Sequence, residues 1–300
     1  MTVASVKVIA PGKLVLTGAY AVLEGAPAIV VAVDRHAVAG TSAPDDVDVR
    51  ALHDEAGRKL GLGSSAASMV ASQGARAVAR GEDLADPLVR TNLFRAVRDA
   101  HAHSQKGGSG VDVAAAVHGG ALRYSIGGSD AASSPPGSSD TTHAQVRSVE
   151  LPPGLVLRAF WSGTSARTSD LRARVDALLA RNGLALARLR LLAAVASSAV
   201  DAGDARAFVL AARDTGAALE ALGHAADAPI VLPAFADLAA RAAAEDGAFL
   251  PSGAGGGDVA VWLALAPPSE AFVDVAGALG MRPLALAVDR GGVRVQSQAS

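Results

Sequence analysis

The stretch Gly61-Leu62-Gly63-Ser64-Ser65-Ala66-Ala67 is a glycine loop that leads directly into an Ala-rich segment, residues 64–80, which we predict to be a helix. A helix start offers backbone N–H groups without intrahelical partners and the positive end of the helix dipole. Glycines let the backbone approach phosphate oxygens closely, and the hydroxyls of Ser64 and Ser65 are suited to capping the helix or reaching Mg²⁺. The stretch therefore predicts a phosphate site, with an ordinary Ser cap after a turn as the plainer alternative.

Two other phosphate-binding motifs match this sequence poorly. Residues 61–66 also fit the G-x-G-x-x-A pattern of dinucleotide-binding proteins, but residues 54–59 before them are polar rather than a buried strand. A second strand ending in an acid about 20 residues later is also not evident. The pattern G-x-x-x-x-G-K-[ST] does not occur in the chain, so a P-loop is excluded.

Three further segments share the character of this loop. Gly107-Gly108-Ser109-Gly110-Val111-Asp112 leads into a short apolar helix at residues 112–118, with an acid in its first turn. Pro251-Ser252-Gly253-Ala254-Gly255-Gly256-Gly257-Asp258 precedes a predicted strand, and so many glycines exceed what a turn needs. Ala10-Pro11-Gly12-Lys13 places a lysine between two predicted strands. Together they indicate a pocket for a phosphate and its acceptor.

The composition favours a folded soluble protein. The 300 residues are 50% hydrophobic, include 32 Gly and carry a net charge of −2, so the chain has no global basic field to attract nucleic acid or an acidic membrane. With no cysteine, disulfides, thiolate metal sites and a Cys nucleophile are excluded. Residues 1–10 do not resemble a signal segment, and the apolar run at 26–33 is too short to span a bilayer. We expect a cytoplasmic protein.

The predicted elements mix strands and helices without a regular βαβ alternation, which favours an α+β fold in two lobes. The predicted strands are residues 3–10, a strand after Pro11-Gly12, 29–33, 36–41, 47–52, 155–161, 259–264, 284–288 and 293–295. The predicted helices are residues 64–80, 88–101, 112–118, 171–180, 184–199, 205–222 and 235–244. Residues 43–46 are expected to form a turn, and residues 127–142 a surface loop.

Taken together, the glycine-rich segments resemble the GHMP kinases. Residues 10–25 resemble the first motif of that family, residues 61–67 its phosphate loop and residues 252–258 its third motif, in the right order. Within the family, residues 108–116, the acid Asp258 and the segment Phe160-Trp161-Ser162-Gly163-Thr164-Ser165-Ala166-Arg167-Thr168-Ser169 most resemble the phosphomevalonate kinase subgroup. One departure is the stretch from Asp34 to Gly61, which is shorter than is usual in relatives.

The resemblance implies a two-lobed architecture. Residues 1–150 are expected to form an ATP-binding lobe of the ribosomal-protein-S5-like type, and residues 151–300 a ferredoxin-like C-terminal lobe. It also implies an ATP-dependent kinase that uses Mg²⁺ and phosphorylates a small molecule, as a monomer or homodimer. Phosphomevalonate is the expected acceptor. Mevalonate or another alcohol is one alternative, and a ligand-binding protein without catalysis is another.

The resemblance assigns roles to individual residues. The predicted catalytic residues are Lys13, as a point charge between donor and acceptor, and Asp112, as a general base or a partner that orients Lys13. The predicted ATP-binding residues are Gly61, Leu62, Gly63, Ser64, Ser65 and Ala66, with Ser65 also reaching the metal. The predicted acceptor-binding residues are Lys13, Lys106, Gly108, Ser109, Gly110, Asp112, Ser165, Ser169, Ser252, Gly253, Ala254, Gly255 and Gly256.

Other cations and the histidines complete the candidates. Arg167 and His103 are further groups that could offset the repulsion between two phosphates. His101 and His103 are two residues apart near a helix end, so their side chains point in different directions. A solvated or capping role is therefore expected for this pair rather than metal ligation.

Overall fold

The computed structural model describes residues 6–104, 107–127, 144–165 and 168–297. The chain forms two compact units: unit 1 contains residues 1–14, 30–121 and 286–300, and unit 2 contains residues 15–29 and 122–285. Helices and sheets are both present, which confirms the α+β class. The units differ from the lobes expected at 1–150 and 151–300, because strands β1 and β2 continue from one unit into the other and the C-terminal segment returns to unit 1.

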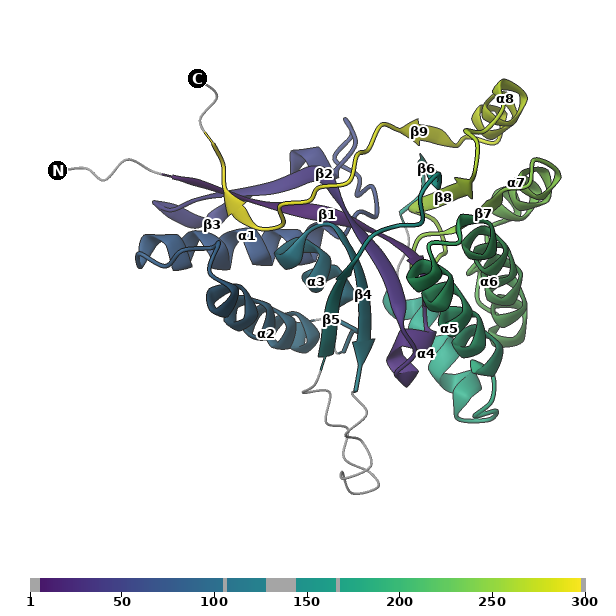
Figure 1. The fold of residues 1–300 in the computed structure, drawn as a ribbon, viewed down its shortest axis with the longest axis horizontal. Coiled ribbons are helices and arrows are strands. Elements are labelled where there is room, and N and C mark those ends of the chain that lie inside the picture. The colour runs from purple at the N-terminus through teal and green to yellow at the C-terminus, as the bar shows by residue number, and fades with distance from the viewer. Residues whose placement is uncertain (1–5, 105–106, 128–143, 166–167, 298–300) are drawn as a thin grey trace. The chain divides into compact units, whose positions relative to one another are not determined.

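Unit 1 combines strands with three helices that pack together (Figure 1). Its elements are β1 (Lys7–Thr17), β2 (Ala28–Gly40), β3 (Ala43–Asp48), the 3₁₀ turn η2 (Arg50–Leu52), α1 (Ser64–Ala79), α2 (Pro87–Ser104), α3 (Val111–His118) and β10 (Arg294–Val295). The sheet that contains β1 has the order β10-β1-β2-β4-β5, where β4 is Ala121–Ile126 and β5 is Ala144–Val149, with β3 paired to β2. Helix α1 contacts β3, α2 and α3, so α1 is the centre of this helical layer.

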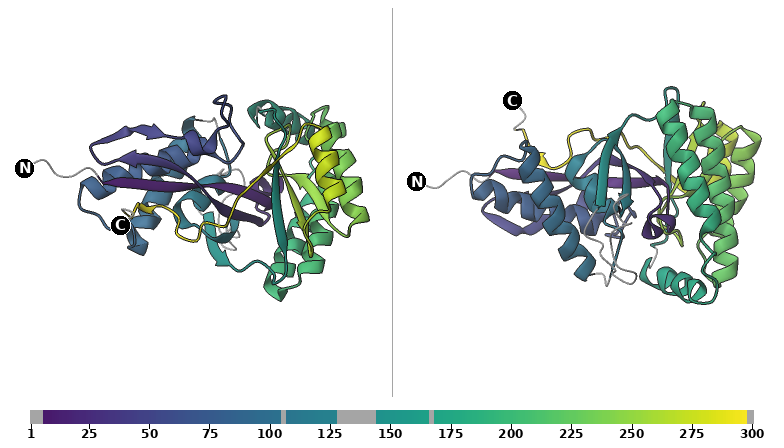
Figure 2. Two further views of the ribbon diagram at one scale, coloured as in Figure 1. Left: turned by 90° about the horizontal axis from the view of Figure 1, so that it is seen from above. Right: turned by 60° about the horizontal axis from the view of Figure 1, so that its bottom comes forward.

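Unit 2 contains a four-stranded antiparallel sheet in the order β7-β8-β6-β9. Its elements are η1 (Ala21–Glu24), β4 (Ala121–Ile126), β5 (Ala144–Val149), β6 (Val156–Trp161), α4 (Thr168–Leu179), α5 (Ala187–Ala202), α6 (Ala205–Ala226), α7 (Pro233–Ala244), β7 (Ala248–Pro251), β8 (Val259–Ala264), α8 (Glu270–Ala278) and β9 (Arg282–Leu284). Every residue of β8 is buried, as its apolar sequence requires. Figure 2 shows the long helices of this unit standing side by side. Within the described ranges, no helix is both long and apolar enough to cross a bilayer.

An aromatic cluster forms part of the core of unit 2. The ring of Trp262 on β8 lies 4.6 Å from that of Phe272 on α8, in an edge-on arrangement. Phe249 and Phe160 also approach Phe272 edge-on, at 5.6 Å and 5.8 Å between ring centres. These packed rings join α8 to the sheet, since aromatic pairs in this geometry add to the free energy gained from burial.

The N-terminal strands run further than their sequence indicates. Pro11-Gly12 does not interrupt the strand. β1 continues through it, because the missing side chain of Gly12 allows Leu62 to approach the strand closely and does not mark a turn. A Cβ at Gly12 would lie 2.8 Å from the carbonyl oxygen of Leu62. Strand β2 likewise merges the two strands predicted at 29–33 and 36–41.

Other predicted elements were wrong or missing. The turn predicted at 43–46 belongs to β3, and the strand predicted at 47–52 ends at Asp48 and is followed by η2. The strand predicted at 284–288 is displaced to β9, with a single bridge between Val33 and Val288. Strands β4, β5 and β7 and helix α8 were not predicted from the sequence, and β7 is only four residues long. Most of the loop predicted at 127–142 lies outside the described residues.

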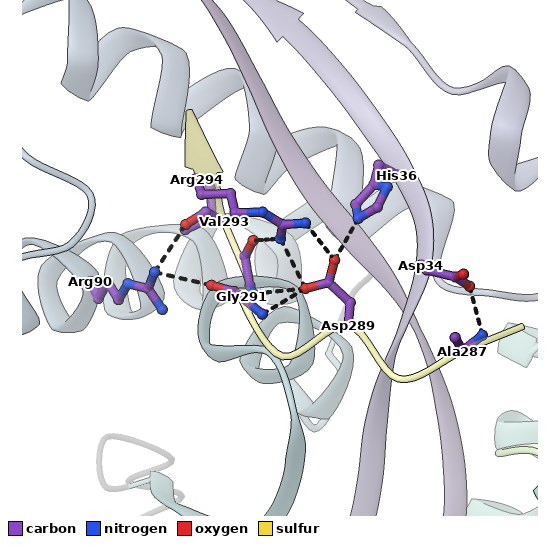
Figure 3. Close-up of polar contacts among 9 residues, drawn as sticks. Asp34, His36, Arg90, Ala287, Asp289, Gly291, Val293 and Arg294 are labelled. Atoms are coloured by element: carbon purple, nitrogen blue, oxygen red, sulfur yellow. Dashed lines mark hydrogen bonds and ion pairs between the residues drawn. The ribbon is translucent and has the colours of Figure 1, made fainter. Parts of the chain in front are cut away.

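The C-terminal segment is fixed to unit 1 by the buried carboxylate of Asp289 (Figure 3). Its Oδ2 lies 2.6 Å from Nε2 of His36 and accepts from Arg294 at 2.8 Å, while Oδ1 accepts from the N–H groups of Gly291 and Gly292. Burial by itself raises the pKa of Asp289, but the bonds from His36 and Arg294 outweigh it and hold that pKa well below its usual range. This carboxylate stays charged and anchors the segment.

Two further side chains hold the same segment (Figure 3). Arg90 on α2 donates to the carbonyl oxygens of Gly291 at 3.0 Å and Val293 at 3.3 Å. Asp34 on β2 accepts from the N–H of Ala287 at 2.8 Å. Residues 287–294 are thereby an integral part of unit 1.

Candidate active site

Lys13 on β1 lies directly against the glycine loop of unit 1. Its backbone N–H donates to the carbonyl oxygen of Leu62 at 2.9 Å, and its Nζ donates to the carbonyl oxygen of Gly61 at 3.1 Å. The loop follows this path because Gly12 presents no side chain to Leu62 and Leu52. The ammonium group of Lys13 is therefore held at the loop that precedes α1.

Gly63 lies between the two predicted catalytic residues. It adopts the left-handed conformation, with φ of 79°, at the N-cap of α1. A Cβ at this position would lie 3.1 Å from Cγ of Lys13 and 3.7 Å from Cβ of Asp112. The structure thus brings Lys13, the loop and Asp112 together within unit 1, as the sequence predicted.

The N-terminus of α1 has the character of an anion site. Its N-cap residue, Gly63, supplies no capping side chain, and its first turn contains no acid. Ser64 is buried in that turn and Ser65 is partly exposed. The backbone N–H groups at the start of this 16-residue helix, together with the nearby ammonium of Lys13, favour binding of a phosphate.

Asp112 is set by the start of α3. Gly110 is the left-handed N-cap of this helix, with φ of 77°, and the N–H of Val111 donates to Oγ of Ser109 at 3.4 Å. Oδ1 of Asp112 accepts from the N–H of Val113 at 3.0 Å. A Cβ at Gly108 would meet nothing within 4 Å, so this position is open toward an incoming molecule or solvent.

His101 is a site residue that sequence reasoning missed. The expected solvated or capping role was wrong for it: His101 is only 4% exposed, and its Nε2 lies 3.9 Å from Oδ2 of Asp112. The sequence feature that indicates its burial is its position on α2, because His101 follows Phe94 and Val97 at helical spacing on the buried face. His103, two residues on, is exposed.

For several other predicted site residues the structure shows few or no contacts. Lys106 and Arg167 lie outside the described residues. Ser165 and Ser169 are exposed in unit 2, and the hydroxyl of Ser169 donates to its neighbour Asp170 at 3.2 Å. Their predicted contact with the acceptor stays a prediction.

The third motif lies in unit 2, where packing accounts for part of its glycine content. A Cβ at Gly255 would lie 2.0 Å from the carbonyl oxygen of Ile230, and one at Gly256 would lie 2.6 Å from Leu171. A Cβ at Gly253 would meet nothing within 4 Å. The buried hydroxyl of Ser252 accepts from the N–H of Val15 at 2.9 Å. The fold thus requires glycine at Gly255 and Gly256, and the position of Gly253 is open to a ligand.

Tyr20 is a second residue that sequence reasoning missed. Its hydroxyl donates to the carbonyl oxygen of Ala254 at 2.7 Å, which fixes the third motif against the first. Burial, and to a lesser degree the nearby Asp176, raise the pKa of Tyr20 far above its usual value, so the hydroxyl keeps its proton. Tyr20 also has a φ of 59°, a strained conformation that surrounding contacts must hold.

Asp258 joins the third motif to the hydroxyl-rich segment after β6. Its N–H donates to the carbonyl oxygen of Thr164 at 2.7 Å, and its own carbonyl oxygen accepts from the N–H of Ser162 at 2.8 Å. Two of the segments that carried the resemblance are therefore neighbours in unit 2.

The residues around α1 include oxygen donors suited to Mg²⁺. In the described part of the chain, no cluster of three or more His, Asp or Glu side chains forms a metal site. Mg²⁺ in kinases is usually held by one or two protein oxygens together with substrate phosphates. The hydroxyl of Ser65 and the carboxylate of Asp112 are oxygen donors of that kind, so this donor set fits.

Comparison with known proteins identifies the relatives of this chain. No family model matches the sequence. The phosphomevalonate kinase of Streptomyces sp. (strain CL190) is 29% identical over an alignment of 352 positions, which covers 89% of this chain and 91% of that enzyme. This match and the fold below confirm the resemblance to the GHMP kinases, and to phosphomevalonate kinase among them.

Two solved structures share the fold. The Lin0012 protein from Listeria innocua matches with a TM-score of 0.81 at 22% identity, over 98% of this chain and 100% of that one. The Streptococcus pneumoniae phosphomevalonate kinase, in complex with phosphomevalonate and AMPPNP, matches with a TM-score of 0.74 at 18% identity, over 95% and 100%. At these identities the structures establish the fold.

Proposed function

We propose that this protein, which has the GHMP kinase fold, is an ATP-dependent phosphomevalonate kinase that converts 5-phosphomevalonate to 5-diphosphomevalonate in isoprenoid synthesis. The observation that supports this most is the position of Gly63 between Lys13 and Asp112 at the start of α1. The similarity to a curated phosphomevalonate kinase over 89% of the chain indicates the acceptor.

The glycine loop binds the ATP phosphates. Backbone N–H groups of residues 61–66 surround the anion, and the dipole of α1 favours its charge. Ser65 and Asp112 would hold Mg²⁺. When bound, Mg²⁺ would neutralise the negative charge that develops on the phosphates during transfer.

Lys13 lowers the repulsion between the two anions that must meet. Phosphoryl transfer needs alignment and neutralised charge more than covalent chemistry. The second pKa of a phosphate monoester is near 6, so phosphomevalonate is mostly dianionic at neutral pH. A single ammonium beside the loop is therefore the group that the reaction depends on most.

Asp112 acts as the partner that orients Lys13. A dianionic acceptor has no proton that must be removed, so a general base adds little. A carboxylate that lies, like Lys13, beside Gly63 instead attracts the ammonium of Lys13 and restricts its orientation. An alcohol acceptor would reverse this assignment, because its hydroxyl proton must be taken up.

The acceptor is bound by the remaining glycine-rich segments. The proposed acceptor-binding residues are Lys13, Lys106, Gly108, Ser109, Gly110, Asp112, Ser165, Ser169, Ser252, Gly253, Ala254, Gly255 and Gly256. Backbone N–H groups and hydroxyls at these positions suit a phosphate and a carboxylate. We also propose a cytoplasmic enzyme that works as a monomer or homodimer.

A coupled assay of ADP release over several acceptors tests this function. With ATP and Mg²⁺, we expect turnover with 5-phosphomevalonate and none above background with mevalonate, homoserine or galactose. Turnover with mevalonate instead would replace the proposed acceptor by an alcohol. Stabilisation by ATP–Mg²⁺ in a thermal-shift assay without turnover of any acceptor would indicate a binding protein and contradict the proposal.

A further inference from the structure

His101 faces the carboxylate of Asp112 from a neighbouring helix. Its side chain is 5% exposed and that of Asp112 is 24% exposed, and 3.9 Å separates Nε2 of His101 from Oδ2 of Asp112. The two residues belong to α2 and α3, which pack against each other in unit 1. The pair therefore links the helix that carries Asp112 to its neighbour at the point where the site lies.

The two oxygens of Asp112 have different surroundings. Oδ1 accepts from the N–H of Val113, in the first turn of α3 itself. Oδ2 faces the imidazole of His101 on α2. At 3.9 Å the imidazole is beyond hydrogen-bond distance, so it limits rotation of the carboxylate by its position and polarity, while Val113 holds the other oxygen directly.

Packing alone does not explain a histidine at this position. The other buried residues of α2 are Leu93, Phe94, Val97 and Arg98, and His101 lies one turn beyond Val97. An apolar side chain would fill this space without the cost of burying an imidazole, which is unfavourable unless a polar partner compensates. Asp112 is a polar group 3.9 Å from this imidazole and offsets part of that cost.

We propose that His101 is a positioning residue for phosphoryl transfer: it fixes the carboxylate of Asp112, which in turn orients Lys13. This inference rests on the proposed function for its kinetic consequences. Because His101 is buried, it acts through Asp112 rather than by contact with the donor or acceptor. Loss of this positioning lowers kcat and leaves the KM values nearly unchanged.

Variants on α2 test this role in the full-length protein. His101→Leu removes the polar group, His101→Gln keeps an N–H near the place of Nε2, and Arg95→Gln is the control on the exposed side of the same helix. We expect a loss of about 5- to 10-fold in kcat for His101→Leu, no larger than the loss for Asp112→Asn, together with partial recovery in His101→Gln and KM values within about twofold. Arg95→Gln should retain wild-type kcat.

A double-mutant cycle separates positioning from a purely structural effect. If His101 acts through Asp112, His101→Leu should lower kcat by less than about threefold in the Asp112→Asn background. Full, additive losses there would overturn the proposal. Equal kcat for wild type and His101→Leu would overturn it as well. His101→Gln keeps the test valid if His101→Leu fails to fold.

An NMR measurement tests the pair without enzymatic activity. In protein with labelled histidine rings, the ring signals of His101 should shift on Asp112→Asn, while those of His103 stay in place. Unchanged His101 signals would overturn the proposal. Absence of turnover by the wild type with every acceptor would contradict the proposed function, and this measurement would still decide whether the two residues interact.

Discussion

Gly63 approaches Lys13 so closely that a Cβ on Gly63 would lie 3.1 Å from Cγ of Lys13, and 3.4 Å from its Cε. The loop before α1 and the lysine of β1 therefore occupy one compact volume in unit 1. The absence of a side chain at Gly63 is a condition for the geometry of the site, and this gives a first test.

Gly63→Ala should reduce activity far more than an equally strained glycine substitution elsewhere. Gly57 has a φ of 75°, close to the 79° of Gly63, but a Cβ there would meet nothing within 4 Å. Both changes cost about 1–2 kcal/mol of stability from the left-handed backbone. In steady-state kinetics only Gly63→Ala should lose at least about tenfold in kcat/KM. Equal kcat/KM for the two variants would show that the close approach has no functional role.

Lys13→Ala should lose much more activity than Asp112→Asn with phosphomevalonate as acceptor. We expect a fall in kcat of roughly 10²–10³-fold for Lys13→Ala, because a fixed charge at the transferring group is removed. Asp112→Asn should lose only about tenfold, since no proton needs to be abstracted. Lys7→Ala, an exposed lysine of the same strand, serves as the control. Equal losses for the two site variants would instead favour an alcohol acceptor.

Tyr20→Phe should weaken acceptor binding through the third motif. Loss of the hydroxyl leaves the carbonyl oxygen of Ala254 without this donor and costs about 1 kcal/mol of stability. We expect a higher KM for the acceptor and a smaller change in kcat. Because burial raises the pKa of Tyr20 far above its usual value, the ratio of mutant to wild-type KM should stay constant between about pH 6 and pH 9. A ratio that varies across this range would contradict a protonated donor.

Asp289→Asn should destabilise the protein by about 3 kcal/mol at neutral pH, because His36 and Arg294 lose a buried charged acceptor. The folded-state pKa of Asp289 is depressed, so its contribution is complete above the unfolded-state value of about 3.9 and is lost as pH falls through the folded-state value. In denaturant titrations the wild type should therefore lose more stability than Asp289→Asn below about pH 4.

The matched control for this change is Asp48→Asn. Asp48 pairs with Arg50 at 2.6 Å on the surface, and the hydrogen bond from Arg50 lowers the pKa of Asp48 to about 2. Exposed pairs contribute less than about 1 kcal/mol, so Asp48→Asn should be nearly neutral. A loss for Asp289→Asn no larger than for the control would show that Asp289 does not anchor the C-terminal segment.

The sequence was most informative where the chemistry is local. The glycine loop, the helix it begins, and Lys13 and Asp112 are each marked by residues close together in the chain. The structure places them together in unit 1, as expected. The α+β class followed from the spacing of apolar residues for the same reason.

Features that depend on tertiary contacts could not be predicted. His101 is defined as a site residue only by the packing of α2 on α3, and Tyr20 only by its bond to Ala254, more than 200 positions away. Pro11-Gly12 resembles a strand break in the sequence, yet a glycine is required at position 12 because Leu62 lies directly against β1 there. The anchor at Asp289 joins residues about 250 positions apart, and no local pattern encodes it.

The most direct test of the proposed reaction is ³¹P NMR of the protein with ATP, Mg²⁺ and 5-phosphomevalonate. Transfer of the γ-phosphate to the acceptor's phosphate predicts loss of the phosphomonoester signal, together with new coupled signals of a diphosphate ester and of ADP. A phosphomonoester signal that stays unchanged while the folded protein binds ATP would contradict it.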